Sequence, residues 1–210
     1  GLEAAAEALR TTDSVTKVAS TSLILPDAEG EPVTVTITGI AKGVGMIHPN
    51  MATMLSVVLT DAAAPPEILW NLLRPAAART WDQLSVDGDT STNDTVFLLA
   101  SGVSGAAPLA SDSPAALAFG GALEAVARDL ARQQAADGEG ATILITASVT
   151  GAADDADARA VARAVVSSSL VKAAAHGKDP NWGRIAGAAG NAVTASAAIL
   201  AAAGLSTEDA

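Results

Sequence analysis

Alternation between apolar and polar positions is the clearest structural signal in the chain. Residues 33–40 read Val-Thr-Val-Thr-Ile-Thr-Gly-Ile, which is the pattern of a strand with one buried face. The turn-forming residues 27–32 precede it and predict a hairpin. By the same alternation or by short apolar runs, we predict strands at 33–40, 54–60, 84–86 and 141–150.

Longer segments carry helical spacing and capping residues. Pro65-Pro66 opens a predicted helix to about Thr80, and Ser113-Pro114 opens one that ends at Ala136, before the stop signal Gly138. Asp154 or Asp155 caps a helix to about Ser167, and another helix follows the turn-rich residues 177–183. Because strands and helices alternate without a strict β–α–β period, we predict an α/β protein of mixed α+β sandwich type, with helices packed on an antiparallel or mixed sheet.

Composition narrows the class of protein. Half of the 210 residues are apolar but only three Trp and two Phe are aromatic, so the core must consist of small aliphatic side chains. A net charge of −11 argues against nucleic-acid binding. The chain has no cysteine, no apolar stretch of membrane length and no recognisable signal peptide. We therefore expect a cytoplasmic protein with no membrane partner. The chain starts without Met, within what reads as a helix, so we expect a fragment or processed product.

Residues 42–53 form a glycine-containing loop that begins with Lys42 and ends with Ala52-Thr53. A phosphate-binding P-loop needs its lysine after the glycines, and a dinucleotide fingerprint needs a third glycine that opens a helix, so neither applies. Thr53 suggests another chemistry. A threonine at a chain start carries its own base, because an α-amine titrates near 7.7–8.0. The alternative is that Thr53 merely begins a strand.

Several segments resemble, in the same order, the bifunctional ornithine acetyltransferases, a self-cleaving family of arginine biosynthesis. The resemblance is carried by 11–13 (TTD), 41–55 (AKGVGMIHPNMATML), 86–95 (VDGDTSTNDT), 137–142 (DGEGAT) and 169–184 (SLVKAAAHGKDPNWGR). Their joint order is far more specific than any one segment.

The resemblance implies autocatalytic cleavage between Ala52 and Thr53. Residues 1–52 would then be the end of an α chain and 53–210 the start of a β chain, with an α2β2 heterotetramer as the expected assembly. Thr53 would be the nucleophile, and Thr11, Lys42, Thr53 and Glu139 would line the substrate site. The implied enzyme is a glutamate N-acetyltransferase that moves acetyl from N-acetylornithine to glutamate. It needs no cofactor, and some members also use acetyl-CoA as donor.

Two departures and two alternatives accompany this reading. The family's oxyanion residues and C-terminal substrate residues fall outside these 210 residues, so we expect little activity from the chain alone, because one lost oxyanion donor costs about 2.7–4 kcal/mol. Ile143 stands where the family usually has lysine. The alternatives are a related self-processing amidase or peptidase and an inactive scaffold.

Three other features have structural interpretations. The acidic tract 87–94 fails the EF-hand pattern, since Thr92 occupies the glycine position, and we expect no metal but a loop of side-chain turns. His48 and His176 do not adjoin a nucleophile motif, and His48 is expected to pack in the loop. Trp182 either anchors its loop to a core or lies at the edge of the acyl site.

Overall fold

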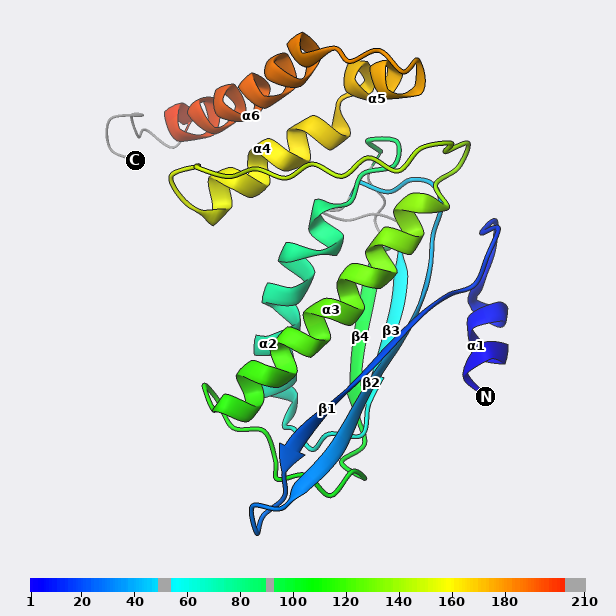
Figure 1. The fold of residues 1–210 in the computed structure, drawn as a ribbon, viewed down its shortest axis with the longest axis vertical. Coiled ribbons are helices and arrows are strands. Elements are labelled where there is room, and N and C mark those ends of the chain that lie inside the picture. Colours follow the sequence, from blue (N-terminus) through cyan, green and yellow to red (C-terminus); the bar gives the residue numbers. More distant parts are fainter. Residues whose placement is uncertain (49–53, 90–92, 203–210) are drawn as a thin grey trace. The chain divides into compact units, whose positions relative to one another are not determined.

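The computed structural model describes residues 1–48, 54–89 and 93–202, with side chains to Ala192. These residues form two compact units, 1–141 and the part from Thr142 onward. Figure 1 shows both units.

A four-stranded mixed sheet forms the first unit. Its strands β1 (Lys17–Pro26), β2 (Pro32–Lys42), β3 (Leu55–Thr60) and β4 (Thr95–Ala100) lie in the order β1-β2-β3-β4. The first three are antiparallel, and β3 and β4 are parallel. The predicted hairpin at 27–32 is confirmed. Its turn is fixed by the Asp27 carboxylate, which accepts the backbone N–H groups of Glu29 and Glu31 at 3.0 and 2.8 Å.

Helices α2 (Pro66–Arg79) and α3 (Pro114–Ala136) cover one face of the sheet, as Figure 1 shows. α3 packs on β1 and β2, α2 packs on α3, and α1 (Leu2–Leu9) contacts β2. Gly39 lets α3 approach β2 closely, because a Cβ atom there would lie 2.7 Å from the Leu130 side chain. A 3₁₀ turn, η1 (Trp81–Gln83), follows α2. The core between the layers is mostly aliphatic, as predicted, with Phe119 and Trp81 as its large aromatic members.

Helices make up the second unit. These are α4 (Asp155–Ser167), α5 (Ser169–His176) and α6 (Trp182–Ala202), and each contacts the other two. Asp154 caps α4 by accepting the Asp157 N–H at 2.9 Å, which confirms the predicted capping. In the part of the chain that the structure describes, no helix is both long and apolar enough to cross a membrane.

Two predicted strands are wrong. Residues 84–86 follow the 3₁₀ turn and form no strand: Leu84 N–H donates back to the Trp81 carbonyl at 2.9 Å, and Val86 N–H donates to the Ile47 carbonyl at 2.7 Å. Residues 141–150 are not in a strand either, although their exposure alternates toward the C-terminal end. An alternating pattern becomes a strand only when a neighbouring strand supplies hydrogen-bond partners, and residues 141–150 pair with none of the four described strands.

Candidate functional site

The loop 43–48, which continues β2 toward Thr53, is held from several sides. Gly43 N–H donates to the Asp13 carboxylate at 2.7 Å, and the Val44 carbonyl accepts from Glu139 N–H at 2.6 Å. Gly43 has φ 134°, a backbone conformation that side-chain-bearing residues rarely adopt. The loop therefore depends on contacts with residues far away in the sequence.

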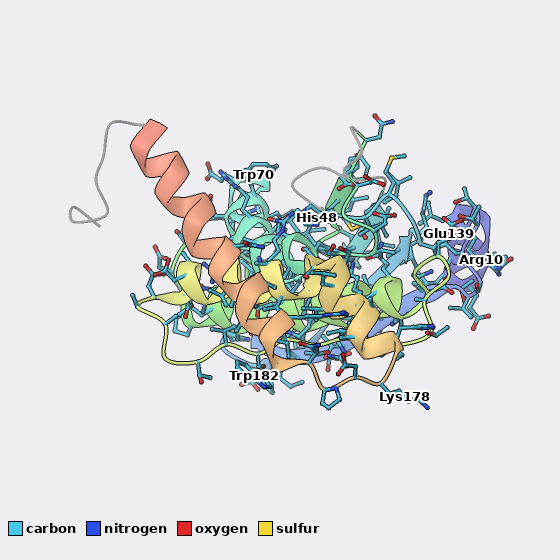
Figure 2. All side chains as sticks on the ribbon, turned by 90° about the horizontal axis from the view of Figure 1, so that it is seen from above. Arg10, His48, Trp70, Glu139, Lys178 and Trp182 are labelled. Atoms are coloured by element: carbon cyan, nitrogen blue, oxygen red, sulfur yellow. The ribbon has the colours of Figure 1, made fainter. Side chains whose placement is uncertain are left out.

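Asp87 binds the same loop from the acidic tract. Its carboxylate accepts Met46 N–H at 2.5 Å and Ile47 N–H at 3.1 Å. It also accepts Asp89 N–H at 3.1 Å, which is the Asx turn expected for this tract. His48 Nδ1 lies 3.1 Å from Ser85 Oγ, so the prediction that His48 packs in the loop is confirmed. Figure 2 labels His48 and Glu139 within this group of loops.

The structure brings the predicted site residues Lys42 and Thr11 together. The Lys42 ammonium donates to Thr11 Oγ1 at 3.1 Å. Behind Lys42, the wholly buried Gln134 side chain donates to the Lys42 carbonyl at 2.8 Å and accepts the Trp81 indole N–H at 3.0 Å. The end of β2 is thus attached to α3 and to η1.

A buried group of three charges lies beneath these residues. The Lys17 ammonium contacts Asp13 Oδ1 at 2.7 Å and Asp137 Oδ2 at 2.6 Å, and the Lys17 and Asp13 side chains are fully buried. Burial raises the pKa of Asp13, but hydrogen bonds from Lys17, Gly43 and Thr11 outweigh it and keep that pKa below its ordinary value. The pKa of Asp137 is lowered likewise, against burial, by Lys17 and Ser14. Both carboxylates are therefore ionised at neutral pH.

A hollow of about 270 Å³ lies beside this group, between residues 12–14, Val44 and residues 136–141. The exposed Glu139 lines it, and Glu139 Oε2 would be 2.8 Å from a Cβ atom placed on Gly45. The absence of a side chain at Gly45 thus lets Glu139 lie against the loop. Thr11, Lys42 and Glu139 all border loop 43–48 or its immediate supports.

The predicted nucleophile Thr53 and its neighbour Ala52 lie outside the described residues. The described chain resumes at Met54, whose N–H donates to Asp94 Oδ1 and whose carbonyl accepts Thr95 N–H at 2.9 Å. Cleavage of the 52–53 bond, and the division of the chain there, stay predictions.

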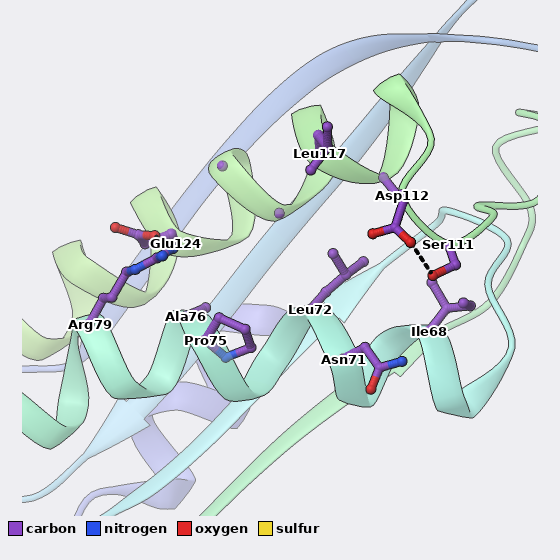
Figure 3. A pocket seen from close by; sticks show the side chains of 13 residues that line it. Ile68, Asn71, Leu72, Pro75, Ala76, Arg79, Ser111, Asp112, Leu117 and Glu124 are labelled. Atoms are coloured by element: carbon purple, nitrogen blue, oxygen red, sulfur yellow. Dashed lines mark hydrogen bonds and ion pairs between the residues drawn. The ribbon is translucent and has the colours of Figure 1, made fainter. Parts of the chain in front are cut away.

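A larger cavity, of about 460 Å³, opens elsewhere in the first unit, between α2 and α3 (Figure 3). Leu72, Pro75 and Leu117 supply apolar lining, and Arg79 and Glu124 form an ion pair at one end. None of the segments that carry the family resemblance lines it. We therefore assign the candidate site to the smaller hollow and the loop.

The segment 169–184 belongs to the second unit. Arg184 there donates to the Leu170 carbonyl at 3.0 Å, and Thr142 Oγ1 lies 3.2 Å from His176 Nδ1. Trp182 is 79% exposed, so the interpretation that it anchors its loop to a core is wrong. Among the residues with described positions, no group of three or more His, Asp or Glu side chains is placed to hold a metal ion.

Sequence reasoning missed the residues that support the site. Asp13 and Asp137 fell within the resembling segments but received no role, and Lys17 and Gln134 carried no signal. A lysine at the start of a strand is usually exposed, and only the fold shows that the distant Asp137 joins the nearby Asp13 in enclosing this one.

Comparisons with known proteins agree with this arrangement. A family model described as the ArgJ family matches residues 1–203. The arginine biosynthesis bifunctional protein ArgJ of Synechococcus sp. is 53% identical over 192 residues, which cover 91% of this chain and 45% of that protein. A chloroplastic protein of the same name from Ostreococcus lucimarinus is 53% identical over 90% of this chain and 40% of its own length. The chain thus spans a little under half the length of these relatives.

A solved structure confirms the fold. The crystal structure of arginine biosynthesis bifunctional protein argJ from Bacillus halodurans matches with a TM-score of 0.65 and 47% identity, over 67% of this chain and 66% of that one. The prediction of a mixed α+β fold of the ornithine acetyltransferase type is therefore correct. With the family model over nearly its whole length, this chain belongs to the ArgJ family.

Proposed function

We propose that this chain is part of an acetyltransferase that moves the acetyl group of N-acetylornithine to glutamate through an ester on Thr53. The observation that carries the proposal is the meeting of distant segments at loop 43–48, which leads to Thr53. Gly43 is bound by Asp13, Val44 by Glu139, and Met46 by Asp87. Each of these partners comes from a different segment that resembles the family.

The charges around the loop suit this substrate. N-acetylornithine carries a carboxylate at one end and an ammonium group at the other. We assign the carboxylate to Lys42, a compact positive charge that Thr11 orients at 3.1 Å. We assign the ammonium group to Glu139, whose exposed carboxylate lines the hollow beside the loop.

The proposed chemistry is a double displacement that starts from cleavage between Ala52 and Thr53. The freed α-amine of Thr53 takes the proton of its own hydroxyl, and Oγ attacks the acetyl carbonyl. The C–N bond breaks, and ornithine leaves as an amine with the proton that the Thr53 ammonium returns. The neutral amine of glutamate then attacks the ester carbonyl, and the Thr53 α-amine takes its proton. The acyl C–Oγ bond breaks, the proton passes to Oγ to restore the hydroxyl, and N-acetylglutamate leaves.

Several further properties belong to the same proposal. We expect no cofactor, an α2β2 assembly of the cleaved chains and a cytoplasmic location. Some members of the family also take acetyl-CoA as donor, and acetylation of glutamate from acetyl-CoA is the direct assay for that second activity.

Intact mass spectrometry is the first test. The wild type should yield pieces 1–52 and 53–210, and Thr53→Ala should remain one chain. Release of ornithine from N-acetylornithine, which we expect to be slow for these 210 residues alone, is then measured with and without glutamate. Release that needs glutamate supports acetyl transfer, whereas equal release without it indicates the amidase alternative. An uncut wild type that is active would refute the Thr53 mechanism, and an uncut, inactive one favours the scaffold alternative.

A further inference from the structure

The group of three charges formed by Lys17, Asp13 and Asp137, here the Lys17 triad, has no part in the chemistry proposed above. It is nonetheless the most completely buried charged group in the described chain, with side chains 0%, 0% and 10% exposed. Burial of an ion pair costs desolvation energy, and an apolar replacement is often as stable or more so. Stability alone therefore does not explain three charges at this position.

The partners of the triad point to another purpose. Asp13 accepts Gly43 N–H at 2.7 Å, beside Lys42, and Thr11 N–H at 3.3 Å. Asp137 accepts Ser14 N–H at 3.0 Å and is the C-cap residue directly after α3, two residues before Glu139. The three segments that carry Thr11, Lys42 and Glu139 are thus joined through one ammonium group.

We propose that Lys17, Asp13 and Asp137 are positioning residues, which fix Thr11, Lys42 and Glu139 relative to one another for N-acetylornithine. This inference rests on the proposed function, because it takes that substrate as the ligand. A fixed spacing matters because a substrate with two charged ends binds well only when the cation and the anion of the site lie at matching positions. None of the three triad residues needs to contact the substrate.

Asp137→Asn is the principal variant, because it keeps the side-chain volume and removes one charge. Its affinity for N-acetylornithine is measured by isothermal titration calorimetry on the whole chain. We expect binding to weaken by about tenfold or more, which corresponds to about 1.4 kcal/mol or more. Amide hydrogen exchange at residues 43–46 should accelerate in the same variant.

Two controls separate positioning from stability. Leu25→Ala removes a core side chain at the far end of β1, 3% exposed, and should lower the melting temperature without changing affinity or exchange at 43–46. Glu124→Gln removes a carboxylate of α3 that pairs with Arg79 and Arg128 at the surface, and should also leave affinity unchanged. Lys17→Met should show the Asp137→Asn effect more strongly.

The outcomes are distinct. If the wild type binds and Asp137→Asn binds equally well with unchanged exchange, the inference is wrong while the proposed function stands. If Leu25→Ala loses as much affinity as Asp137→Asn, the triad is merely structural and the inference is wrong. A wild type that binds no N-acetylornithine overturns the proposed function, and the substrate role of the triad falls with it.

Discussion

Gln134→Leu isolates the contact that attaches the end of β2 to α3. The Gln134 side chain is wholly buried, accepts from the Trp81 indole N–H at 3.0 Å and donates to the Lys42 carbonyl at 2.8 Å. Leucine has a similar size but forms neither bond, so the variant leaves the buried Trp81 N–H and the partly buried Lys42 carbonyl without this partner. A buried polar group without a partner costs about 1–3 kcal/mol and a partly buried one less, so the two losses together cost about 2–4 kcal/mol.

This loss is measurable by thermal unfolding. For a chain of this size, 1 kcal/mol corresponds to about 2–4 °C, so the melting temperature should fall by on the order of 10 °C. Circular dichroism is the suitable probe, because it does not depend on the tryptophans.

A double-mutant cycle with Trp81→Phe checks the reasoning. Phenylalanine removes the indole N–H, so Gln134→Leu should cost less in the Trp81→Phe background by about 1–3 kcal/mol. Gln133→Leu serves as a second comparison, because Gln133 instead binds the backbone of Val18 at β1. If Gln134→Leu costs under about 0.5 kcal/mol, or costs the same in both backgrounds, the Gln134–Trp81 contact does not stabilise the fold.

Three further predictions concern the site and its support. Lys42→Met should weaken binding of N-acetylornithine, and unchanged affinity in a titration would refute the carboxylate role of Lys42. Because the folded-state pKa values of Asp13 and Asp137 lie below their ordinary values, their stabilising effect should be complete above about pH 4 and be lost as pH falls further. Urea titrations across this range should show that loss in the wild type and less of it in Asp137→Asn. Gly39→Ala should lower the free energy of unfolding by about 1–3 kcal/mol, because its Cβ would lie 2.7 Å from the Leu130 side chain. An unaltered midpoint of urea unfolding would show that the sheet and α3 can move apart without cost.

Local patterns predicted the elements whose signals lie within one segment. The alternation of 33–40 and the caps at Ser113 and Asp154 led to β2, α3 and α4. β1 was missed because its outward positions are Ser20 and Ser22, which hydrogen-bond to neighbouring threonines and give little apolar contrast with the small Ala19. Such strands are specified by their neighbours rather than by their own residues.

The candidate site likewise contains residues that the sequence identified and residues that it did not. Thr11, Lys42 and Glu139 were found through resemblance, because their segments keep a recognisable order. The Lys17 triad could not be predicted from the sequence. The stretch of chain between Asp13 and Asp137 is longer than the whole sheet, and both carboxylates reach Lys17 only because α3 packs on β1. Charges that depend on such packing leave no spacing signal in the chain.

The place of β2 beside β3 bears on what a cut between residues 52 and 53 would do. The two strands pair from Ile37 with Thr60 to Lys42 with Leu55, so one product would contribute β1 and β2 and the other the adjoining β3, β4 and both covering helices. Val35 and Ile37 from the first product share their core with Phe119 and Leu123 from the second. Hydrolysis would therefore leave two polypeptides in one folded body, which should travel as a single species through a sizing column and separate only in denaturant.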